Sequence, residues 1–142
     1  MIAAAKYIQQ AIYTLLIGDL ALMAILEGVF DYPPDNMAYP FIQIGAVTST
    51  EYRTLSRPGE EVTVTIHIYS DYLGNKEALE ILDEVNRLMG DVTNISISNY
   101  TLIASWFEFY EVLRDHLSAE GLILCHIPVR YRFKVQSTTG YS

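Results

Sequence analysis

The sequence predicts an α+β fold in which one antiparallel or mixed sheet of about four long strands carries helices on one face. Residues 60–70 alternate between apolar and polar side chains and are rich in β-branched residues, as in a strand buried on one face. Residues 76–89 repeat apolar side chains at a spacing of three and four, and Gly90 ends this amphipathic helix. Because the strand face and the helix stripe can cover each other, they form the centre of the predicted fold.

Length and charge limit the possible functions. The 142 residues are 51% hydrophobic, which predicts a single domain over residues 1–142 with a flexible tail at 137–142. The net charge of −8 argues against tight binding of nucleic acid or anionic membranes, since both need clustered Lys and Arg. A single cysteine, Cys125, cannot form an internal disulfide, which fits a reducing compartment.

The N-terminal third begins with an apolar segment. Residues 2–17 have helical spacing and end at Gly18, and Asp19 is placed to cap a short second helix over 20–26. Polar residues interrupt the segment and no cationic stretch precedes it, so we expect a packed helical element rather than a signal peptide or membrane span. A short strand is expected over 29–32.

Two long strands follow, joined by a polar connector. Alternation over 41–52 predicts the first strand, after a proline-rich turn at 33–36. The odd-numbered residues from Phe41 to Ser49 are expected on one face and the even-numbered ones from Ile42 to Thr50 on the other. Residues 53–59 connect to the strand at 60–70 and are expected to form a mobile hairpin tip.

The last part of the chain predicts a second hairpin. Asn75 is placed to cap the helix at 76–89, and residues 92–99 form a loop or a poor edge strand. A strand is expected over 101–113, a turn over 114–121, and a final strand over 122–136. In the first of these strands, one face is expected to carry Leu102, Ala104, Trp106, Glu108 and Tyr110.

No catalytic or metal-binding motif is present in the sequence. His67 and His126 could meet across paired strands, but a metal site would also need a carboxylate, and half-exposed strand histidines are the alternative. Cys125 is followed by His126, yet neighbours in a strand point to opposite faces, which argues against a nucleophile–base pair. We therefore expect no catalytic, cofactor-binding or metal-binding residue.

Charged residues form two surfaces. The acidic side chains of the helix at 76–89 are expected to form a solvated face, with Lys76–Glu80 and Asp83–Arg87 as ion pairs. In the last strand Arg130, Arg132 and Lys134 share a face with His126 and Pro128. This basic face pairs with Glu108 or Glu111 across the sheet, serves only solubility, or contacts an acidic second copy of the chain. Eleven tyrosines favour an interface, although β-propensity alone would also select them.

The order of these parts resembles the tail-completion, or tail terminator, proteins of long-tailed bacteriophages. The resemblance covers nearly the whole chain and consists of strand and turn patterns rather than catalytic motifs. The segments that carry it are Val29-Phe30-Asp31-Tyr32-Pro33-Pro34, Tyr39-Pro40-Phe41-Ile42-Gln43-Ile44-Gly45, residues 61–70, the Gly74-Asn75-Lys76-Glu77-Ala78 helix start and the closing Tyr131-Arg132-Phe133-Lys134-Val135.

The resemblance implies a structural virion protein without cofactors, made in the host bacterial cytoplasm and located at the head–tail junction. It implies a homo-hexameric ring that caps the tail tube, ends tube polymerisation and offers its other face to the head connector or stopper protein. DNA would pass through the lumen without specific binding, and no membrane is involved. The candidate interface residues are Glu51, Tyr52, Arg53, Thr54, Leu55, Ser56, Arg57, Arg130, Arg132, Lys134, Glu77, Glu80 and Glu84.

Two other interpretations stay open. One is a small α+β ligand-binding domain or enzyme, which would need a pocket that joins His67, His126 and a carboxylate. The other is a different structural subunit of a tail-like assembly, such as a tube or baseplate protein. A tube protein should polymerise by itself, whereas a terminator should not.

Overall fold

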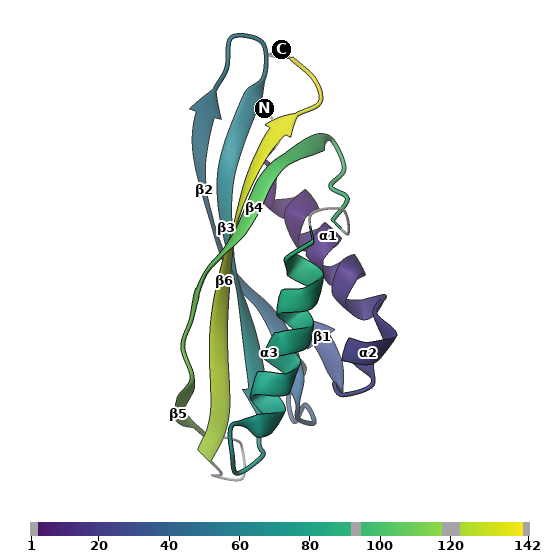
Figure 1. The fold of residues 1–142 in the computed structure, drawn as a ribbon, viewed down its shortest axis with the longest axis vertical. Coiled ribbons are helices and arrows are strands. Elements are labelled where there is room, and N and C mark those ends of the chain that lie inside the picture. Colours follow the sequence, from purple (N-terminus) through teal and green to yellow (C-terminus); the bar gives the residue numbers. More distant parts are fainter. Residues whose placement is uncertain (1–2, 92–94, 118–122, 141–142) are drawn as a thin grey trace.

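A computed structural model of the protein describes residues 3–91, 95–117 and 123–140 and confirms the α+β class. One twisted sheet forms a layer, and the helices pack together on one of its faces (Figure 1). The elements are α1 Ala5–Ile17, α2 Leu20–Met23, β1 Gly28–Phe30, β2 Phe41–Arg53, β3 Pro58–Ser70, α3 Lys76–Met89, β4 Tyr100–Tyr110, β5 Leu113–Leu117 and β6 Ile123–Ser137.

The sheet has six strands in the order β1-β2-β3-β6-β4, with β5 also paired to β6. The four long strands are antiparallel as predicted, and the short β1 pairs with β2 in parallel. The predicted turn at 114–121 is wrong in its first part, because residues 113–117 form β5. With 15 residues β6 is longer than the 11-residue β4, so its far end has room for this second partner.

The core lies between the sheet and the helices. Val62, Val64, Ile66 and Ile68 are fully buried on the helix side of β3, as their alternation predicts. The apolar stripe of α3 covers them with the buried residues Ala78, Ile81, Leu82, Val85, Leu88 and Met89. The predicted strand–helix unit is therefore the centre of the fold.

β-Bulges overturn the predicted faces of β2 and β4. The register of β2 shifts between Ile44 and Val47, so Ile42 and Ile44 face the helices before the bulge while Val47 lies opposite Val64 after it. β4 has two such shifts, between residues 102 and 104 and between 107 and 109. Each bulge adds one residue and exchanges the two faces of the strand, which a strict period of two does not anticipate.

The helix ends agree only in part with the predictions. The Asp19 carboxylate caps α2 by accepting from the Leu22 N–H at 2.9 Å, but α2 is shorter than expected. The prediction that Asn75 caps α3 with its side chain is wrong, because this side chain makes no capping hydrogen bond. Arg87 pairs with Glu84 and Asp19, each at 2.7 Å, rather than with Asp83. The pair of Arg87 with Asp19 joins α3 to the start of α2.

The predicted loop at 92–99, turn at 114–121 and tail at 137–142 are described only in part. Residues 92–94, 118–122 and 141–142 lie outside the described residues, and with them parts of the predicted loop, turn and tail. Ile95 and Ile97 are buried without forming a strand, so the loop interpretation holds for the described part of 92–99. Ser137 belongs to β6 rather than to a tail, and the Thr138 N–H donates to the Asn99 carbonyl at 3.0 Å.

Candidate assembly surfaces

The two strand histidines do meet, on the face of the sheet that no helix covers. His67 Nδ1 lies 2.8 Å from His126 Nε2, and the Tyr69 ring stacks on His126 with centroids 4.5 Å apart. Burial lowers the pKa of His67 and so favours its neutral form. Within residues 3–91, 95–117 and 123–140, no group of three His, Cys, Asp or Glu side chains is placed to hold a metal ion. The pair is therefore half-buried and lacks the carboxylate that the metal hypothesis requires.

Cys125 is fully buried on the helix side of β6, and so points away from the neighbouring His126. Its Sγ donates to Asn75 Oδ1 at 3.7 Å. Burial raises the pKa of the thiol, which disfavours the reactive thiolate. This geometry describes a packed cysteine rather than a nucleophile.

The basic face of β6 is paired within the sheet. Arg130 Nε lies 2.7 Å from a Glu108 carboxylate oxygen, and Arg132 contacts the other oxygen of the same carboxylate. Hydrogen bonds from Arg132, and then from Arg130, lower the pKa of Glu108. Lys134 lies over the Tyr52 ring, 4.7 Å from its centroid. The predicted cross-strand pairing with Glu108 is thus confirmed. Because Arg130 and Arg132 are paired within the subunit, less of their charge is available for contact with a second copy.

The acidic side chains of α3 make local contacts. Glu77 accepts from Ser70 Oγ at 2.7 Å, which ties the start of α3 to the end of β3. Lys76 and Glu80 form the predicted pair at 4.0 Å, and Glu84 pairs with Arg87. Such exposed pairs contribute less than about 1 kcal/mol each to stability. An interface role for this helix face stays a hypothesis.

The β2–β3 hairpin projects beyond the helix layer at one end of the molecule (Figure 1). Its tip is a closed turn in which the Thr54 N–H donates to the Arg57 carbonyl at 3.3 Å and the Arg57 N–H donates to Thr54 Oγ1 at 3.1 Å. Leu55 stands in this turn with its side chain fully exposed. The tip therefore presents one apolar side chain between Arg53 and Arg57.

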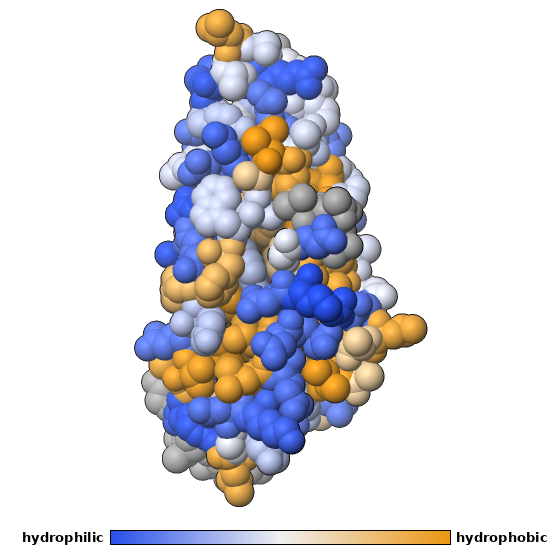
Figure 2. Space-filling model, in the orientation of Figure 1, coloured by the Kyte–Doolittle hydropathy of each residue, from blue (hydrophilic) through white to orange (hydrophobic). Residues whose placement is uncertain are grey.

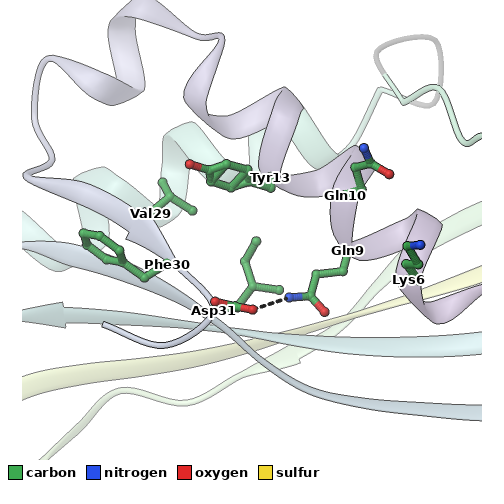
Figure 3. A pocket seen from close by; sticks show the side chains of 8 residues that line it. Lys6, Gln9, Gln10, Tyr13, Val29, Phe30 and Asp31 are labelled. Carbon is green, nitrogen blue, oxygen red and sulfur yellow. Dashed lines mark hydrogen bonds between the residues drawn. The ribbon is translucent and has the colours of Figure 1, made fainter. Parts of the chain in front are cut away.

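A groove lies between α1 and the β1–β2 edge of the sheet (Figure 3). It has a volume of about 610 Å³. Gln9 Nε2 donates to Asp31 Oδ2 at 3.4 Å across one part of it. The lining residues are Lys6, Gln9, Gln10, Tyr13, Val29, Phe30, Asp31 and Ile44. Sequence reasoning missed this surface, because its walls come from segments that only the tertiary fold brings together.

The opposite edge of the sheet carries exposed apolar side chains. β4 pairs with β6 on one side, and no strand of the described chain pairs with its other side. Its exposed apolar residues are Ile103, Trp106, Phe107, Phe109 and Tyr110, each between 42% and 50% exposed. Natural edge strands are usually short or charged, so a long aromatic edge indicates a binding surface. The sequence places Trp106 and Tyr110 in this strand, but it does not show that the strand lies at an open edge of the sheet.

Comparison with known proteins identifies the family. The family model described as "Tail completion protein gp17" matches residues 10–136. A relative from Bacillus phage SPP1, named tail completion protein gp17, is 25% identical over 136 residues, which are 94% of this chain and 96% of the relative.

Solved structures share the fold. A chain in the virion of a native gene transfer agent particle aligns with a TM-score of 0.83 at 21% identity, over 96% of this chain and all of that one. The structure of the bacteriophage SPP1 gp17 protein aligns with a TM-score of 0.60 at 23% identity, over 92% of this chain and 89% of that one. No helix of the described residues is long and apolar enough to cross a membrane. The family match over residues 10–136 shows that the chain belongs to the tail completion protein gp17 family and is a structural protein of a phage-type tail.

Proposed function

We propose that this protein forms a hexameric ring that caps the tail tube, ends tube polymerisation and provides the surface on which the head is joined. The observation that carries the proposal is where the exposed apolar side chains lie. Besides those on the helices and the segments around β1, such side chains occur at both ends of an elongated subunit and along an open edge of its sheet.

The two ends suit two axial partners. Leu55 is fully exposed at the β2–β3 tip, while Tyr72 and Leu73, 50% and 91% exposed, lie in the loop after β3. Because β3 runs from one loop to the other, these groups lie at opposite ends of the molecule, and Figure 2 shows hydrophobic surface at both. In the proposal one end meets the last ring of tube subunits and the other meets the head connector or stopper protein.

The flanks suit neighbours within a ring. A cyclic ring with one subunit per position requires two different, complementary patches on each subunit. The two edges of this sheet differ, since one is the long β4 and the other is the short β1 beside β2. An unlike pair of edges supports head-to-tail association that closes on itself.

The charge of the subunit suits a channel for DNA. The net charge is −8, and Arg130 and Arg132 are already paired with Glu108. A wall without unpaired clusters of cations makes few phosphate contacts, so DNA can pass without specific binding.

The charged patches predicted from the sequence have a smaller role in this proposal. The basic face of β6 and the acidic face of α3 remain a candidate pair, but their internal partners limit what they contribute. Exchanging Arg130 and Arg132 for glutamates, with Glu108→Lys added to keep the pairing between β4 and β6, reverses the charge of the patch. Loss of the ring in this triple variant would give the β6 face a larger share of the interface.

Native mass over a concentration series, with negative-stain images, tests the ring. We expect closed six-membered rings that do not lengthen, either alone or at the ends of tubes assembled from the tail tube protein of the same particle. Added protein should shorten such tubes. Open-ended filaments of this chain alone would overturn the proposal in favour of a tube subunit.

A further inference from the structure

We infer that the ring closes when the β4 edge of one subunit docks on the β1–β2 edge of the next subunit and places its aromatic side chains in the groove beside α1. The inference rests on the ring proposed above and assigns its subunit interface. The occupant of the groove is a second copy of this chain.

The β4 edge carries aromatic rings on both faces of the sheet. Trp106 and Phe109 lie opposite Arg132 and Arg130 of β6, on the face without helices. Phe107 lies opposite the buried Tyr131, with ring centroids 6.1 Å apart, and therefore points to the helix side. Tyr110 is on that side too and packs against Phe107 with centroids 5.9 Å apart. In Figure 2 apolar surface is visible on the side of the molecule where β4 runs.

The other flank offers an open strand and a hollow together. β1 covers β2 only at residues 41–43, so in the described chain β2 from Ile44 to Arg53 has no strand partner on its outer side. The groove lies beside this free stretch, and Ile44 belongs to its lining. Tyr13 of α1 is 41% exposed and lines the groove above β1 (Figure 3).

Strand directions allow the two edges to meet. From β2 through β3 and β6 to β4 every pairing is antiparallel, so β2 and β4 run in opposite directions. Rotation about an axis roughly along the strands keeps these directions. It therefore places β4 of one subunit antiparallel to β2 of the next, which is the commoner strand pairing. A closed ring repeats this contact at every position and leaves no sheet edge open.

The groove accepts the side chains that such pairing brings to it. Phe107 and Tyr110 point to the helix side of β4, and the groove lies on the helix side of β2 between the sheet and α1. Its lining mixes aromatic rings with the amides of Gln9 and Gln10, which suits an amphipathic tyrosine.

Two single variants and their mixture test the interface. Tyr110→Asp damages the β4 edge and leaves the groove intact, whereas Tyr13→Asp damages the groove and leaves β4 intact. Each variant alone should sediment as a single subunit of 16.1 kDa. An equimolar mixture should form a dimer and nothing larger, because only one intact β4 edge can meet one intact groove. Leu20→Asp, at an 88% exposed position on α2, is the matched control and should still form rings.

Circular dichroism tests whether the variants fold. If Tyr13→Asp does not fold, Gln10→Asp takes its place, because Gln10 also lines the groove. Rings that persist in either interface variant, or a mixture that stays monomeric, would overturn this inference while the wild-type ring keeps the proposed function. A wild-type protein that forms no ring, alone or on tail tubes, would remove the proposed function and this interface with it.

Discussion

Replacing Glu60 with alanine should destabilise the fold far more than the same replacement at its neighbour Glu61. Glu60 is 5% exposed and lies on the helix side of β3. Its carboxylate accepts from the Ala4 backbone N–H at 2.9 Å, the Tyr100 hydroxyl at 3.2 Å and Ser49 Oγ at 2.6 Å. One side chain thus joins the start of α1 to β2 and β4.

The size of the effect follows from these contacts. The alanine variant leaves the buried Ala4 N–H and the nearly buried Tyr100 hydroxyl without their acceptor, at a cost of roughly 1–3 kcal/mol each. Relief of the desolvation of a buried carboxylate offsets part of this, so we expect a loss of about 3 kcal/mol. Glu61 contacts Arg132 at 3.4 Å and is partly exposed, so its loss should cost below about 1 kcal/mol.

Urea unfolding and thermal melting measure the difference. For a chain of this size, about 3 kcal/mol lowers Tm by roughly 6–12 °C. Glu60→Gln keeps one acceptor oxygen and should fall between wild type and Glu60→Ala. Equal losses at Glu60→Ala and Glu61→Ala would show that the buried hydrogen bonds do not contribute as argued.

Three further predictions follow from single sites. Burial raises the pKa of Tyr100 to about 12 and also raises that of Tyr131, so these tyrosines ionise at lower pH in the unfolded chain than in the folded one. The free energy of unfolding should therefore be unchanged below about pH 10 and fall as the pH rises toward 12. Tyr131→Phe should weaken this fall, as measured by urea unfolding at several pH values. Leu55→Ser should leave Tm unchanged, because the side chain is fully exposed, while tube capping weakens in the tube-length assay. Gly45→Ala should lower the free energy of unfolding, measured in urea, by about 1–2 kcal/mol, since the new Cβ would lie 2.5 Å from the His67 ring. Adding His67→Ala should restore most of this loss, and no recovery would contradict the steric account.

The candidate surfaces show where sequence reasoning ends. The exposed hairpin tip could be predicted, because Leu55 lies in a polar connector between two strong strand patterns. Its order could not, since the turn depends on hydrogen bonds between Thr54 and Arg57. No sequence pattern predicts the groove beside α1, because Gln9 and Asp31 become neighbours only when α1 packs on the β1–β2 edge.

The sequence by itself determined the α+β class, the β3–α3 centre and the polar face of β6, because each rests on a local period of side chains that burial on one face requires. The tertiary structure decided the faces of β2 and β4, the partner of Arg87 and the two open sheet edges. These depend on bulges and on contacts between distant segments. A bulge inserts one residue without changing local composition, and a strand becomes an edge only when the order of the whole sheet is set.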